Sequence, residues 1–201
     1  ATAFTGSGAV IGDAIAADPR VRKISFTGSR DVGEHICQTA GLKKVTMELG
    51  SNAPLIVMPD ADLDKVAEAT ATTGYANAGQ VCISAQRVMV NENVYGDFLD
   101  ALTPKVNALN PGNPLEDGVT MGPMIRETDA VRVNDWIQEA VGAGARVLTG
   151  GERTGTLHAP TVIADVDPNM QISCNEVFGP AVAVSRFESI EEAIGNANET
   201  N

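Results

Sequence analysis

Short apolar runs alternate with longer helical stretches along the chain, and this alternation constrains its fold more than any other feature. The run Leu55-Ile56-Val57-Met58 is apolar throughout, which is typical of a strand buried in a parallel sheet. We expect strands at 21–26, 45–49, 55–58, 85–90, 146–148, 161–166 and 181–187. We expect helices at 9–17, 31–40, 62–77, 94–109, 127–141 and 190–197. The predicted fold class is α/β, with a doubly wound, parallel or mixed sheet and helices on both faces.

One cysteine stands in a short polar turn, Asn77-Ala78-Gly79-Gln80-Val81-Cys82, and Glu48 ends an apolar run upstream. A thiolate attacks carbonyl carbon readily, and a carboxylate can activate water to release an acyl group. The two histidines, His35 and His158, are far apart in sequence, and His158 is expected in a loop. The alternatives are a buried cysteine that packs as a small hydrophobe and a solvent-facing carboxylate at a strand end.

Four short motifs occur in order: Phe26-Thr27-Gly28-Ser29, Glu48-Leu49-Gly50, Gly79-Gln80-Val81-Cys82 and Asn175-Glu176-Val177-Phe178-Gly179-Pro180. Together they resemble the NAD(P)-dependent aldehyde dehydrogenase family, and the likeness runs from Gly6 to the last residue. The resemblance implies an aldehyde dehydrogenase-like fold that is truncated at both ends. Residues 1–49 are then expected to form the C-terminal part of an NAD(P)-binding Rossmann-like domain. Residues 50–201 are expected to form a catalytic domain that is incomplete at its C-terminus.

The resemblance also implies a role for each motif residue. Cys82 is the expected nucleophile, which forms a thiohemiacetal and then a thioester, and its N–H is an expected oxyanion donor. Glu48 is the expected general base for hydrolysis of the thioester, in a largely apolar pocket. The expected cofactor-binding residues are Gly8, Gly28, Ser29, Leu49, Gly50, Glu176 and Phe178.

The expected cofactor contacts differ along the chain. Gly28 and Ser29 precede a predicted helix, where N–H groups bind phosphate, although Ser29 also suits the role of helix N-cap. Gly8 is expected on the adenine side. Glu176 is expected on the nicotinamide ribose and Phe178 behind the ring; their alternatives are a solvated loop acid and a core aromatic.

The composition narrows the classes of function. A net charge of −12, from 26 acidic and 14 basic residues, disfavours nucleic acid and anionic membranes as partners. No apolar run approaches the ~20 residues of a transmembrane helix, and no signal peptide is expected. Three cysteines without a disulfide or metal pattern favour a reducing cytoplasm, and no metal site is expected. Asp60, Asp62 and Asp64 are expected to cap a helix rather than to bind calcium.

The expected partners are a small aldehyde, NAD or NADP, and further copies of the chain in a dimer or tetramer of the full-length parent. We expect an NAD(P)-dependent aldehyde dehydrogenase whose 201-residue fragment is by itself inactive or nearly so. Residues around Cys82 resemble those of relatives that act on lactaldehyde or glyceraldehyde derivatives. Two alternatives stay open: a CoA-acylating semialdehyde dehydrogenase, and a truncated, non-catalytic fragment or interaction module.

Overall fold

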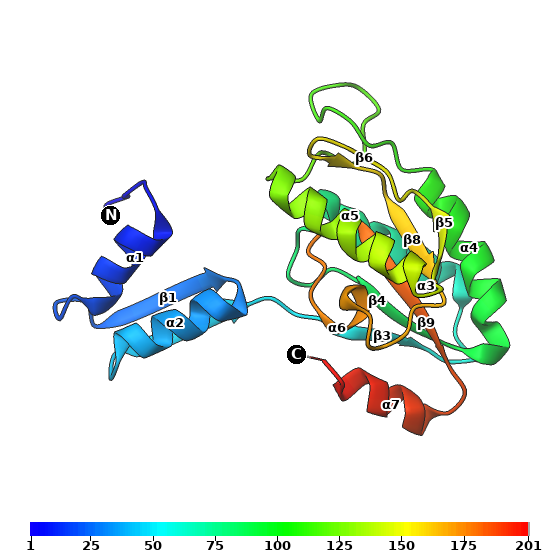
Figure 1. Ribbon diagram of the computed structural model, residues 1–201, viewed down its shortest axis with the longest axis horizontal. Helices are drawn as coiled ribbons and strands as arrows, with labels where there is room; N and C mark the ends of the chain where they lie inside the picture. The colour runs from blue at the N-terminus through cyan, green and yellow to red at the C-terminus, as the bar shows by residue number, and fades with distance from the viewer. Residues whose placement is uncertain (201) are drawn as a thin grey trace. The chain divides into compact units, whose positions relative to one another are not determined.

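The computed structural model describes residues 1–200 of the chain. The chain divides into two compact units, Ala1–Gly50 and Ser51–Asn201 (Figure 1). The domain boundary predicted after residue 49 falls beside this division.

The first unit consists of α1 (Gly8–Ala17), β1 (Lys23–Gly28), α2 (Arg30–Ala40) and β2 (Lys44–Leu49). The two strands are parallel, as a helical crossover between them requires. Their register pairs Thr27 with Glu48 and Gly28 with Leu49. Helix α2 packs on both strands and on α1, and it buries Gly33, Ile36 and Ala40.

The second unit is built on a five-stranded sheet of order β3-β4-β9-β8-β5. The strands are β3 (Pro54–Val57), β4 (Arg87–Asn91), β5 (Arg146–Thr149), β8 (Thr161–Ala164) and β9 (Ala181–Phe187). Neighbouring strands are parallel, except that β5 runs antiparallel to β8. The sheet is therefore mixed, and every residue of β4 and β8 is buried.

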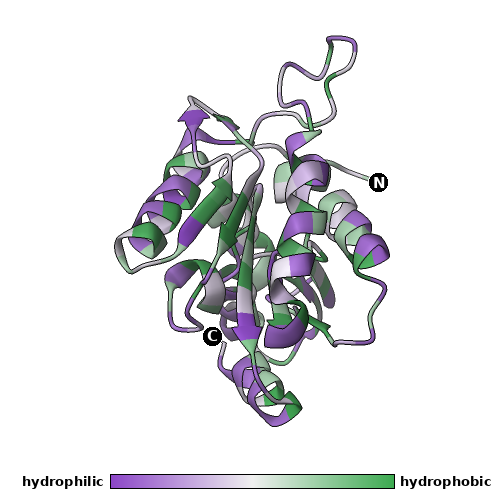
Figure 2. Cartoon of the chain, turned by 90° about the vertical axis from the view of Figure 1, so that its right-hand side faces the viewer, coloured by the Kyte–Doolittle hydropathy of each residue, from purple (hydrophilic) through white to green (hydrophobic). Residues whose placement is uncertain are grey.

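Helices cover both faces of this sheet, because successive side chains of a strand point to opposite sides. In β4, Val88 and Val90 belong to the main core, which includes residues of α3 (Leu63–Tyr75), α4 (Tyr95–Asn107) and α5 (Glu127–Gly142). Met89, between the two valines, packs with Phe187 and with Ala193 of α7 (Ile190–Asn198). The central strands are accordingly hydrophobic along most of their length (Figure 2). The predicted doubly wound α/β fold is confirmed.

Several short elements were not predicted, because a few residues carry too little periodicity. They are the antiparallel hairpin of β6 (Arg153–Thr154) and β7 (Leu157–His158), the single turn α6 (Gln171–Cys174), and the 3₁₀ turns η1 (Ala76–Gly79) and η2 (Glu92–Val94). The expectation of a loop residue at His158 is wrong, because this side chain lies in β7 and is only 1% exposed.

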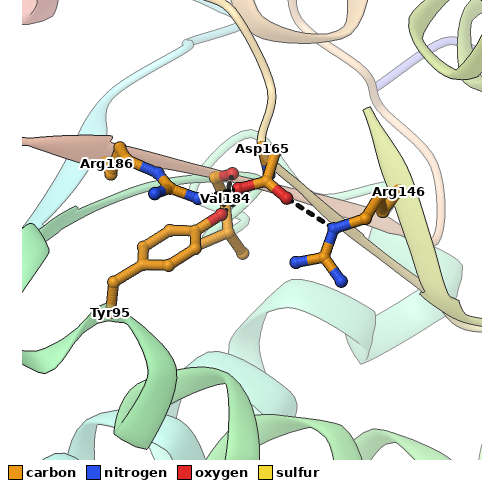
Figure 3. Close-up of polar contacts among 5 residues, drawn as sticks. All are labelled: Tyr95, Arg146, Asp165, Val184 and Arg186. Atoms are coloured by element: carbon orange, nitrogen blue, oxygen red, sulfur yellow. Dashed lines mark hydrogen bonds and ion pairs between the residues drawn. The ribbon is translucent and has the colours of Figure 1, made fainter. Parts of the chain in front are cut away.

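A cluster of charged and polar groups joins β5, the end of β8, β9 and α4 (Figure 3). The Asp165 carboxylate accepts hydrogen bonds from Arg146 Nε at 2.6 Å and from Arg186 Nη2. The Asp165 N–H donates to the Tyr95 hydroxyl at 2.7 Å, and that hydroxyl donates to the Val184 carbonyl at 3.3 Å. Asp165 has a φ of 58°, so β8 ends earlier than predicted.

Candidate active site

Cys82 occupies the second position of a β-turn, which is closed by a 3.0 Å hydrogen bond from the Ser84 N–H to the Val81 carbonyl. The turn lies between η1 and β4, and the cysteine is exposed. This exposure contradicts the alternative of a buried, packing cysteine. Within residues 1–200, no hydrogen bond uses the Cys82 N–H. An accessible thiol beside an unpaired N–H suits an attacking sulfur with its own oxyanion donor.

The three residues before Gln80 hold the backbone in the left-handed region, with φ of 50° at Asn77, 55° at Ala78 and 69° at Gly79. This conformation costs a non-glycine residue roughly 1–2 kcal/mol, so other contacts must hold the segment. Asn77 Nδ2 donates to the Gln80 carbonyl at 3.2 Å, and Gln80 Nε2 donates to the Asn77 carbonyl at 3.0 Å. Gln80 Oε1 accepts from the Ile125 N–H at 3.0 Å. Side-chain amides therefore fix the backbone that leads into the cysteine turn.

Gly79 brings this segment against the loop that carries Glu176 and Phe178. A Cβ atom at Gly79 would lie 2.0 Å from the carbonyl oxygen of Gly179. Only glycine combines the left-handed φ with such a close backbone approach. Two motifs that are far apart in sequence are thus in backbone contact.

Glu176 is partly buried, and its carboxylate is held in place by the Ser51 N–H, which donates to Oε1 at 3.1 Å. Burial raises the pKa of the Glu176 carboxyl, while the Ser51 N–H and the Arg132 guanidinium act in the opposite direction. Phe178 is 37% exposed and has a φ of 44°, an unusual backbone conformation for a bulky residue. The alternatives of a solvated acid and a core aromatic are therefore not observed.

Ser51 connects the cysteine turn to Glu176. Its hydroxyl donates to the Cys82 carbonyl oxygen at 2.6 Å, and its N–H donates to the Glu176 carboxylate. Two residues predicted from separate motifs therefore each lie within one hydrogen bond of the same serine. Here the structure brings the predicted nucleophile and a predicted cofactor-binding residue together.

In the first unit, the parallel pairing of β1 and β2 brings four predicted residues to one edge. Gly28 pairs with Leu49, so Ser29 and Gly50 follow at the carboxyl ends of neighbouring strands. This edge is where α/β sheets bind ligands. Ser29 is the N-cap of α2, but its hydroxyl makes no capping hydrogen bond. Gly8 begins α1, which packs on α2.

Glu48 lies on β2 of the first unit, and its side chain is exposed. The apolar pocket expected around this carboxylate stays a prediction. Cys82 belongs to the second unit, so the pairing of Glu48 with Cys82 remains a prediction.

Among the described residues, no cluster of three or more His, Cys, Asp or Glu side chains is placed to hold a metal ion. His35 Nε2 contacts Asp13 Oδ1 at 2.9 Å, and Cys37 is exposed. Asp62 caps α3 through a 3.3 Å hydrogen bond from the Lys65 N–H, which confirms the predicted capping. Of the helices in residues 1–200, none has both the length and the apolar character of a membrane span.

Sequence reasoning missed three residues of the site, Ser51, Gln86 and Arg132. Arg132, on α5, donates through Nη2 to the Val177 carbonyl at 2.8 Å and lies over the Trp136 ring at 4.6 Å. Each of the three contacts a segment that is distant in sequence. Neither helical periodicity nor a short motif marks such a contact in advance.

The chain is similar in sequence to a known protein family and to characterised relatives. The sequence model of the aldehyde dehydrogenase family matches residues 1–201. A 3-sulfolactaldehyde dehydrogenase of Priestia aryabhattai is 44% identical over 198 residues, which are 98% of this chain and 42% of that protein. The chain thus spans about two fifths of the length of the curated relatives that it matches.

Two solved structures show the same fold. One is an NAD-dependent aldehyde dehydrogenase from Sinorhizobium meliloti, with a TM-score of 0.93 and 38% identity over 98% of this chain and 40% of that one. The other is a glyceraldehyde-3-phosphate dehydrogenase from Methanocaldococcus jannaschii complexed with NADP. Its TM-score is 0.94, with 39% identity over 98% of this chain and 43% of that one.

Proposed function

The chain belongs to the aldehyde dehydrogenase family, and from this membership we propose that its protein oxidises an aldehyde to a carboxylic acid with NAD⁺ or NADP⁺. The observation that carries the proposal is the pair of hydrogen bonds by which Ser51 joins Cys82 to Glu176. The nucleophile and a cofactor-binding side chain belong to one constellation, as oxidation of a sulfur-bound substrate requires.

Cys82 attacks the aldehyde carbon as a thiolate, and a thiohemiacetal forms as the carbonyl π bond breaks. The unpaired Cys82 N–H donates to the oxygen that gains negative charge. A bound oxidised nicotinamide would supply the acceptor for a hydride from the substrate carbon, so that Cys82 would then carry the acyl group as a thioester. Glu48 then takes a proton from water, which attacks the thioester, so the acid leaves and the Cys82 thiolate returns.

The residues present fit a dinucleotide. In the second unit, the Glu176 carboxylate is oriented through Oε1 and would hold the nicotinamide ribose, while the exposed Phe178 would back the ring. In the first unit, Gly28 and Ser29 would hold the pyrophosphate at the start of α2. Leu49 and Gly50 would line the nicotinamide end, and Gly8 the adenine side.

The proposal gives each of the two units a different role. The first is proposed as the C-terminal part of a Rossmann-like cofactor domain, and the second as the catalytic domain. A homo-oligomer in the cytoplasm is part of the same proposal; the three free cysteines, Cys37, Cys82 and Cys174, suit a reducing compartment.

For the substrate, we favour a small hydroxyaldehyde. The similarity to proteins named for 3-sulfolactaldehyde and glyceraldehyde 3-phosphate supports this class. A CoA-acylating semialdehyde dehydrogenase is the second candidate. Other relatives are named for succinate and glutarate semialdehydes, which supports a semialdehyde as its substrate.

Acyl transfer tests the nucleophile without any cofactor. p-Nitrophenyl acetate should acetylate Cys82 of the 201-residue chain at least about tenfold faster than Cys37, because only Cys82 has an unpaired N–H for the oxyanion. Cys37 is a matched internal control, since it is also exposed but lies inside α2, where helical hydrogen bonds use the N–H groups. Mass spectrometry locates the acetyl group. Equal acetylation of both cysteines would contradict the proposal.

The complete reaction is measured as NADH or NADPH formation with a panel of small aldehydes. The 201-residue chain is compared with a form completed by the flanking segments of the Priestia relative. Cys82→Ser should abolish turnover, Glu48→Gln should slow release of the acid, and Cys37→Ser should leave the rate unchanged. CoA-dependent product would favour the acylating alternative. Absence of Cys82-dependent turnover in every form would favour a non-catalytic module.

A further inference from the structure

Gln86 is a buried amide at the centre of the second unit's candidate site. It directly precedes β4, and its exposed fraction is only 2%. A buried amide group is costly unless all of its hydrogen-bonding capacity is used. The partners of Gln86 therefore show what the residue holds together.

The side chain of Gln86 makes four hydrogen bonds. Nε2 donates to the Ser51 carbonyl at 2.9 Å and to Asn52 Oδ1 at 3.2 Å. Oε1 accepts from the Val177 N–H at 2.8 Å and from the Phe178 N–H at 3.2 Å. Two donors and two acceptor positions are all that an amide offers, so this side chain is saturated.

These bonds join the two segments on which the cofactor residues depend. On one side stands Ser51, which holds both Cys82 and the Glu176 carboxylate. On the other side stands the backbone of Val177 and Phe178. An apolar side chain could make none of these bonds, and a carboxylate would lack the donors.

The four hydrogen bonds of Gln86 form a bridge from Ser51 and Asn52 to Val177 and Phe178. At its Phe178 end the backbone is strained. Its φ of 44° lies in the left-handed region, which a bulky residue adopts only when its surroundings hold it there. The Gln86 acceptor fixes the Phe178 N–H, and Arg132 fixes the Val177 carbonyl from α5. The backbone that presents the exposed Phe178 ring is thus held by buried Gln86 and by half-buried Arg132.

We propose that Gln86 is a positioning residue, whose amide sets the loop of Glu176 and Phe178 against the Ser51 segment and so places these two side chains for the nicotinamide end of the cofactor. It touches neither substrate nor cofactor and acts through the backbone that it holds. The part of this assignment that concerns the cofactor rests on the proposed function; the bridge itself does not.

The bridge is tested in the 201-residue chain by amide hydrogen exchange, measured by NMR. Gln86→Met should speed exchange at Val177 and Phe178 at least about tenfold, because both amides lose their acceptor. Exchange at Val184 of β9 should stay unchanged. The matched control is Asn91→Leu, which removes a buried amide at the far end of β4 and should leave Val177 and Phe178 slow. Unchanged exchange at the two amides, or an equal rise at Val184, would overturn the bridge.

The positioning role is tested in whichever form of the protein shows Cys82-dependent turnover. Gln86→Met should raise KM for the nicotinamide cofactor at least about fivefold in the fraction of enzyme that is active, whereas Asn91→Leu should lower only the amount of active enzyme. Gln86→Glu keeps the acceptors, so it should raise KM less than Gln86→Met. Faster exchange with an unchanged cofactor KM would overturn the positioning role and leave the proposed function standing. Lack of Cys82-dependent turnover in every form of the protein would instead refute the proposed function, while the exchange result would still decide the bridge.

Discussion

The Ser51 hydroxyl donates a 2.6 Å hydrogen bond to the carbonyl oxygen of Cys82, which lies 31 residues farther along the chain. This bond fixes the turn from which the thiol projects, and the Ser51 N–H holds the Glu176 carboxylate at the same time. One serine therefore couples the positions of two predicted functional residues.

Removal of this hydroxyl should loosen the cysteine turn. Ser51→Ala is expected to lower the free energy of unfolding by about 1 kcal/mol, the net value of one hydrogen bond. It should also speed amide exchange at Ser84, whose N–H closes the turn. Denaturant titration and NMR exchange measure the two effects. Thr73→Ala is the control, since that hydroxyl bonds within its own helix, to the Ala69 carbonyl. Equal effects of the two substitutions on exchange at Ser84 would refute the coupling.

Gly79 should tolerate no side chain. Gly79→Ala adds a Cβ atom 2.0 Å from the Gly179 oxygen at a φ of 69°. We expect a loss of roughly 2–4 kcal/mol in unfolding free energy, from backbone strain and displacement. Gly195→Ala is the control: it lies in α7 with no neighbour within 4 Å, and helix propensity should stabilise it by up to about 1 kcal/mol. A Gly79→Ala variant as stable as the parent would show that the two loops separate freely.

The Asp165 cluster should make stability depend on acid pH. Burial tends to raise the pKa of the Asp165 carboxyl, but hydrogen bonds from Arg146 and Arg186 outweigh it and lower the pKa. In the unfolded chain this carboxyl titrates at about pH 3.9. The stabilisation by the ionised Asp165 is therefore complete above that pH and is lost as pH falls through the folded pKa. Asp165→Asn suits the left-handed backbone and should cost about 1 kcal/mol at neutral pH, since the pairs are partly exposed.

Unfolding midpoints measured at pH 7 and at pH 3 test this cluster. The difference between Asp165→Asn and the parent should shrink toward acid. A difference that is the same at both pH values would contradict the ionic origin of the stabilisation.

His158 should destabilise the fold when it gains a proton. The Ala159 carbonyl can only accept a hydrogen bond, so the neutral ring carries its proton on Nδ1, 2.9 Å away. Nε2 is buried without a partner among the described residues. Burial is the main cause that lowers the pKa of His158; the Ala159 carbonyl opposes it, and Arg153 lowers the pKa further.

The sign of the His158 effect follows from this lowered pKa. The unfolded imidazole binds a proton at about pH 6.5, whereas the folded imidazole binds one only at a lower pH. Stability is therefore complete above that pH and is lost as pH falls toward the folded pKa. His158→Leu should remove this part of the pH dependence, as measured by unfolding midpoints between pH 7.5 and pH 5. A parent and variant with parallel pH profiles would exclude the histidine as the cause.

Local sequence patterns determined the fold class of this protein and the place of its cysteine turn. Alternating apolar runs predicted the α/β fold, because strand and helix periodicities arise from neighbours along the chain. The Asn77–Cys82 stretch predicted a cysteine in a short turn, and the structure has such a turn. That the thiol is exposed is seen only in the structure. The antiparallel direction of β5 and the hairpin that buries His158 carried no such local pattern.

Tertiary structure decided how the motifs meet. The sequence marks Glu176 and Phe178 by a motif, but Ser51 and Gln86 have functional meaning only through hydrogen bonds to segments far along the chain. The left-handed backbone of Phe178 likewise opposes its local preference, and it persists because the buried Gln86 side chain accepts a hydrogen bond from its N–H. The physical reason is that propensity acts between neighbours, whereas the saturation of buried amides is settled only when distant segments pack.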